Sequence, residues 1–125
     1  MSQEIALVYN LKEERLRKVR GVLMFLGIRV REVKTEEYGI PVGNLIENTT
    51  NEEYKVEGDF AEEMMVLSMA PSRVNDLLQR FRRHKVALPT LTAVLTETNA
   101  KWDSVTLAAE LRQEREAIMQ GKTEH

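Results

Sequence analysis

Small polar side chains follow three apolar segments that the sequence predicts to be strands. They are Asn10, Ser68, Thr96, Thr98 and Asn99. In a parallel α/β sheet the carboxyl ends of the strands share one edge, and ligands bind in the crevice there. Helices are predicted to begin just after Asn10 and Ser68, and the free N–H groups of helix N-termini favour anions. These five residues therefore predict a binding site for an anion or another small ligand.

The same residues have a purely structural interpretation. Asn10 and Ser68 could only cap helices, and Thr98 and Asn99 could only shape a turn, since polar side chains of this size favour both positions. The two interpretations differ most at Asn99, which lies beyond the last apolar residue of its strand. If it binds a ligand, replacing it should affect binding more than folding.

Groups suited to catalysis are scarce. There are two histidines and no cysteine, and the chain has no phosphate-binding loop, nucleophile elbow or zinc-ligand spacing. We therefore predict no catalytic residue, no metal and no cofactor, and a binding or interaction module rather than an enzyme. The alternatives are an enzyme acting on a small anionic substrate, with Glu97 as its base, and a self-associating protein-interaction domain.

Hydrophobic periodicity predicts the elements that must position the site. Helical spacing of apolar residues predicts three helices, and short apolar runs predict four strands. The helices are expected at 12–26, 71–84 and 104–120, and the strands at 4–9, 28–33, 63–69 and 91–96. The first strand and helix repeat weakly after a shift of 58 residues: Leu7 falls on Met65 and Leu23 on Phe81.

Two strand–helix–strand units predict a single α/β domain with a mostly parallel, four-stranded sheet. If both crossovers are right-handed and the two units run outward from adjacent central strands, the strand order is 2-1-3-4. Helices then cover both faces, and the first two helices lie on opposite faces. The alternative is a ferredoxin-like α+β sandwich with both helices on one face. The domain is expected to span residues 1–121, with an irregular and mobile connection at 36–62 and a frayed tail at 122–125.

Composition limits the partners. The net charge is −2, which makes a nucleic-acid partner unlikely. Basic residues predominate in 12–34 and 73–85 and acidic residues in 36–62, a pattern that would suit a homodimer. The first ten residues carry no basic segment before an apolar run, and no run is long enough for a membrane span. We expect a cytoplasmic protein whose partner is an unknown small molecule or protein, without a membrane.

The segment after the fourth strand resembles a family of small bacterial proteins described only as a domain of unknown function. Family members are similar along most of the domain and end in a lysine-alanine-valine-leucine-threonine-x-threonine-asparagine-x-x-tryptophan signature. The matching residues here are Ala93, Val94, Leu95, Thr96, Thr98, Asn99 and Trp102. Thr92 replaces the usual lysine, so no role that needs a cation there carries over. The resemblance implies a stand-alone cytoplasmic domain and no assigned activity.

Overall fold

The fold is built on a four-stranded sheet with the predicted order β2-β1-β3-β4. In the computed structural model, which describes residues 4–49 and 54–121, each strand lies within a residue or two of its predicted position. The strands are β1 (Ile5–Tyr9), β2 (Arg29–Glu32), β3 (Met64–Ser68) and β4 (Leu91–Val94). The α/β class, the single domain and the strand order are therefore confirmed.

The two central strands run in opposite directions. β1 is parallel to β2 and β3 is parallel to β4, but β1 and β3 are antiparallel, with Leu7 opposite Val66. The sheet is thus mostly parallel with one antiparallel pair. The expectation that β1, β3 and β4 end at one edge is wrong, because Tyr9 at the end of β1 pairs with Met64 at the start of β3.

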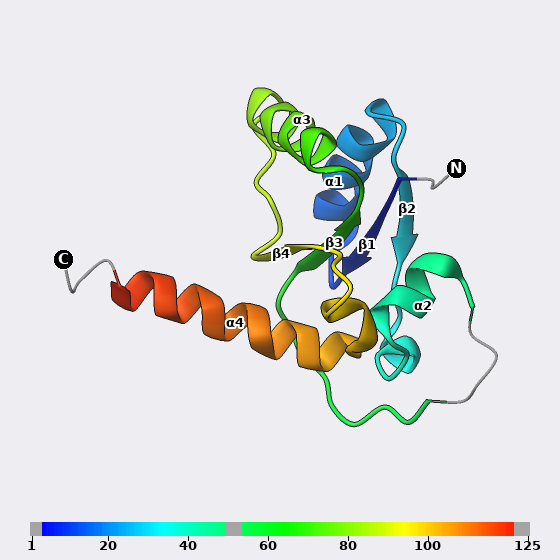
Figure 1. Ribbon diagram of the computed structural model, residues 1–125. Coiled ribbons are helices and arrows are strands. Elements are labelled where there is room, and N and C mark those ends of the chain that lie inside the picture. Colours follow the sequence, from blue (N-terminus) through cyan, green and yellow to red (C-terminus); the bar gives the residue numbers. More distant parts are fainter. Residues whose placement is uncertain (1–3, 50–53, 122–125) are drawn as a thin grey trace.

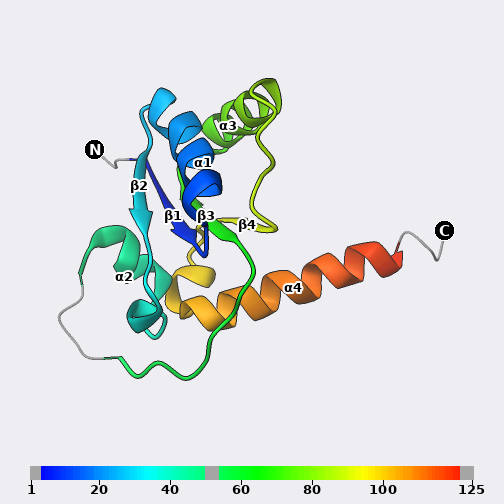
Figure 2. The ribbon, with the colours of Figure 1, turned by 180° about the vertical axis from the view of Figure 1, so that it is seen from behind.

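Helices α1 (Glu13–Phe25) and α3 (Pro71–Arg83) cover the same face of the sheet (Figures 1 and 2). The prediction that they lie on opposite faces is wrong, and the antiparallel seam explains why. The second β-α-β unit is related to the first by a half-turn within the plane of the sheet. Such a rotation reverses the strand direction and keeps the crossover right-handed, so the helices of both units lie on one face. Val19, Leu23, Leu77 and Phe81 anchor the two helices there.

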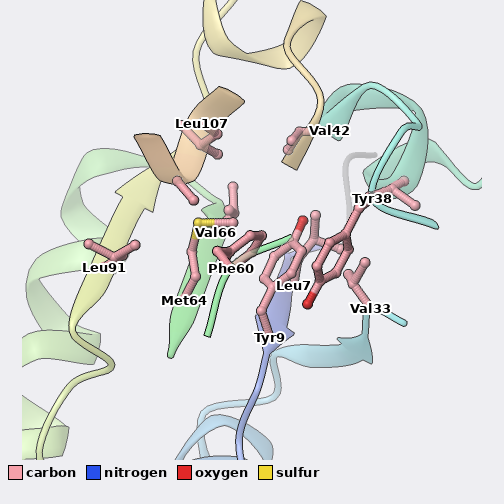
Figure 3. Close-up of a cluster of buried hydrophobic side chains, with 12 residues drawn as sticks. Leu7, Tyr9, Val33, Tyr38, Val42, Phe60, Met64, Val66, Leu91 and Leu107 are labelled. Atoms are coloured by element: carbon pink, nitrogen blue, oxygen red, sulfur yellow. The ribbon is translucent and has the colours of Figure 1, made fainter. Parts of the chain in front are cut away.

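The opposite face is covered by α2 (Val42–Glu47) and the first half of α4 (Ser104–Gly121). Helices on both faces are therefore confirmed. Figure 3 shows the core on this side, where Tyr9, Tyr38 and Phe60 pack together beneath Leu107. The hydroxyl groups of Tyr9 and Ser104 are hydrogen-bonded at 2.8 Å, and burial raises the pKa of the Tyr9 phenol.

The predicted irregular connection, 36–62, contains regular structure among its described residues. It contains the end of a short 3-10 turn (Thr35–Glu37) and all of α2, and after an extended stretch it returns to the core at Phe60. Residues 50–53 within it, and the predicted frayed tail at 122–125, lie outside the described residues. The mobility of this connection stays a prediction.

Two ion pairs join distant parts of the chain and should make stability depend on pH. Arg73 donates two hydrogen bonds to Glu4, and Arg112 does the same to Glu62. These bonds hold the pKa of each carboxyl below its ordinary value. A lowered folded-state pKa gives stabilisation that is complete above the ordinary pKa and is lost as the pH falls through the folded-state pKa.

We therefore expect the free energy of unfolding in urea to fall between about pH 5 and about pH 3, and to fall less steeply in Glu4→Gln and Glu62→Gln. Glu57→Gln, at an exposed glutamate outside these pairs, serves as the control. Equal pH profiles for wild type and the two ion-pair variants would contradict this assignment.

Candidate functional site

The structure divides the five predicted site residues among three places. Asn10 lies beyond the end of β1, at the opposite edge of the sheet from Ser68, because Ser68 pairs with Ile5 at the start of β1. Ser68 lines a groove at the carboxyl ends of β3 and β4. Thr96, Thr98 and Asn99 form the turn after β4 and line a second, smaller groove. The five residues therefore do not form one cluster.

The side chain of Asn10 is engaged in holding the connection 54–63. Its amide nitrogen donates to the carbonyl oxygens of Phe60 and Glu62 at 2.9 and 3.0 Å, and its amide oxygen accepts from the Tyr38 hydroxyl. Asn10 has a φ of 60°, in the left-handed region that asparagine tolerates better than most residues. It caps no helix, since the N-caps of α1 and α3 are Lys12 and Ala70.

Asn99 takes the place of a neighbouring strand at the outer edge of β4. Its amide nitrogen donates to the Val94 carbonyl at 3.1 Å, and its amide oxygen accepts from the Thr96 N–H at 2.8 Å. The Asn99 N–H in turn donates to the Thr96 hydroxyl. An edge strand otherwise leaves its outward backbone N–H and carbonyl groups unpaired, so this buried amide supplies hydrogen-bond partners at the end of β4.

The larger groove, here called the strand-end groove, crosses the sheet beside Ser68. Its volume is about 800 Å³, within the usual range for small-molecule sites. Its main lining residues are Ile5, Arg29, Arg31, Leu45, Ser68 and Leu95. Arg29 pairs with Ile5, and Ile5 pairs with Ser68. Leu67 pairs with Val94 in parallel strands, so the residues that follow them, Ser68 and Leu95, also lie side by side. One row of side chains from all four strands therefore forms the floor.

Arg31 joins the floor of this groove to its wall. Its guanidinium donates to the Leu45 carbonyl at 2.7 Å, to the Glu37 carboxylate at 2.7 Å and to the Asn48 side chain at 3.2 Å. These bonds fasten the C-terminal end of α2 beside β2. The sequence did not predict this wall, because α2 is placed by tertiary contacts.

The remaining polar groups include one carboxylate that faces the groove. Glu47 also lines the strand-end groove beside Arg29 and Arg31, whereas the Glu32 carboxylate accepts a hydrogen bond from Arg20 of α1. The Ser68 hydroxyl makes no hydrogen bond to the other described residues. Glu97, the base required by the enzyme alternative, lies in a separate depression with Lys101.

A comparison with family models gives a partial match. Residues 63–118 match the model described as Domain of unknown function (DUF3783). The matched segment contains β3, α3, β4 and most of α4, and with them Ser68 and the Thr96–Asn99 turn. No curated protein and no solved structure matches the chain.

Two further observations concern the described residues alone. In 4–49 and 54–121, no three histidine, aspartate or glutamate side chains are grouped closely enough to hold a metal ion. None of the helices in these ranges has both the length and the apolar character that a bilayer span requires.

Proposed function

We propose that the protein is a binding module whose site is the strand-end groove, and that its ligand is a small organic acid. The observation that carries the proposal is the row Arg29, Ile5, Ser68 and Leu95, which offers a cation, an apolar surface, a hydroxyl and a second apolar surface in order. Small-molecule sites commonly combine an apolar lining with a few polar groups that orient the ligand.

The charges suggest how the ligand would be selected. A carboxylate or phosphate next to Arg29 would gain a charge-assisted hydrogen bond, while Ile5 and Leu95 would cover the apolar body. Glu47 would repel a second negative charge. We therefore infer that the site prefers ligands with one acidic group and disfavours polyanions such as nucleic acid.

The test is a screen of aliphatic and aromatic carboxylic acids against their primary amides. We expect a subset of the acids, but not the matching amides, to raise the melting temperature and to shift the amide NMR signals of Ile5, Ser68 and Leu95. Arg29→Gln should weaken binding by about 10-fold or more, the usual size of a lost charge-assisted hydrogen bond.

Arg17→Gln is the matched control, because it removes an exposed arginine of α1 that does not line the strand-end groove. Equal binding of acids and amides would overturn the proposal. So would NMR shifts confined to Glu97 and Lys101, which would instead support the enzyme alternative.

A further inference from the structure

The C-terminal half of α4 projects away from the body of the domain (Figures 1 and 2). The first half is anchored by the buried residues Ser104, Leu107 and Ala108, and Leu111 packs against the same core. From residue 113 to residue 119 every side chain is exposed. Among them are two large apolar side chains, Ile118 and Met119, with exposed fractions of 63% and 61%.

Ile118 continues the stripe that attaches α4 to the domain. Leu107, Leu111 and Ile118 are spaced by four and seven residues, which places them on one helix face, and Glu114 and Arg115 occupy the turn between Leu111 and Ile118. The apolar stripe therefore extends beyond the domain that covers it, and Ile118 has no cover among the described residues.

A groove lies where α4 leaves the domain. It has a volume of about 290 Å³ and is bounded by Ala93, Val94, Leu107, Leu111 and Glu114. Val94 is itself exposed to 37%. The groove thus presents the exposed Val94 and the half-buried Leu111, among polar residues such as Thr96, beside the root of a helix whose tip carries exposed apolar side chains.

We propose that a second copy of this chain covers both surfaces, in a two-fold dimer formed by antiparallel pairing of the projecting helices. A two-fold interface must be self-complementary, so that residue i meets residue j and j meets i. Centring the axis between Glu114 and Arg115 satisfies this requirement. Ile118 of each copy then meets Leu111 of the other at the groove, and Glu114 meets Arg115.

Charge complementarity selects this register. Both pairs of unlike charges form at once, and each apolar tip enters the groove at the root of the other helix. Arg115 is available for this pairing because its only described bond is a 3.5 Å contact to the Thr90 carbonyl in an exposed setting. Phe25 and Met24 form another exposed apolar patch, and Phe25→Asp tests whether assembly uses that patch instead.

The experiment measures molar mass by light scattering and sedimentation over protein concentrations from about 1 µM to about 1 mM. We expect a dimer that does not grow further. Ile118→Asp should weaken dimerisation by about 100-fold, because the two-fold axis repeats the change and both Ile118–Leu111 contacts are lost. The fold should be unchanged by circular dichroism, since Ile118 touches no core residue in the monomer.

A charge exchange gives the sharper test. Glu114→Arg and Arg115→Glu each place like charges opposite each other twice, so either should weaken the dimer, whereas the double exchange should restore it. Glu116→Arg makes the same charge change on the opposite helix face and should have no effect. A monomeric wild type, a double exchange as weak as the single ones, or an assembly abolished by Phe25→Asp but not by Ile118→Asp would overturn the proposal.

Discussion

Replacing Phe60 by alanine is expected to destabilise the protein by about 3–4 kcal/mol, the usual cost of deleting a buried aromatic ring. Phe60 belongs to no helix or strand, but its ring stacks on Tyr38 at a centroid distance of 4.8 Å and contacts Tyr9 at 5.6 Å. Its carbonyl accepts the amide of Asn10. The ring is therefore the point at which the long connection is attached to the core.

The measurement is urea unfolding together with hydrogen exchange of the amides at 54–62. The variant should lose protection in this segment by more than the global destabilisation explains. Phe25→Ala is the matched control: that ring is 66% exposed, and its main described contacts are to Arg80 and His84, so its removal should cost less than about 1 kcal/mol. Equal costs for the two variants would show that Phe60 is not an anchor.

Asn99→Ala is expected to cost about 2–4 kcal/mol, because it leaves the Val94 carbonyl and the Thr96 N–H without their partner at a buried position. In thermal melting this corresponds to a fall of roughly 10 °C for a domain of this size. This result would support the structural interpretation of Asn99 over the ligand-binding interpretation.

Thr98→Ala provides the comparison within the same turn. Thr98 is exposed, and its side chain caps no helix, so its removal should change stability by less than about 0.5 kcal/mol. If Asn99→Ala melts like Thr98→Ala, the amide is not needed to close the edge of β4, and a ligand-binding role for Asn99 would regain support.

Secondary structure was predictable here because local rules determine it. The apolar spacing of α1 and α3 and the short apolar runs of β1 and β3 place each element within a residue or two of its observed bounds. The strand order was also correct, because right-handed crossovers and the assumption that the two units run outward from adjacent central strands lead to 2-1-3-4.

The relative direction of the two units was not predictable in this way. β1 is buried on both faces and β3 nearly so, and such strands read as continuous apolar runs whichever way their neighbour points. Right-handed crossovers are compatible with both arrangements. The expected placement of Asn10 and Ser68 at one edge of the sheet was wrong for the same reason, because the edge at which each residue lies depends on strand direction.

The sequence left the role of Asn99 open for a different reason. An asparagine amide offers one acceptor and two donors, and the same groups serve a ligand or the chain's own backbone. A single sequence does not distinguish these uses. The strand-end groove was only partly visible, through Ser68, because its other wall comes from α2 and from the bonds of Arg31.

The antiparallel seam between β1 and β3 has a consequence for how the molecule is assembled. Each β-α-β unit is contiguous in sequence, whereas the seam joins residues near the start of the chain to residues past its middle. Closing so long a loop is entropically costly, so seam formation should come late in folding. A chain severed between the units would keep each unit whole. The seam would then be an interface between two fragments, and we expect the fragments to associate through it as the subunits of a heterodimer do.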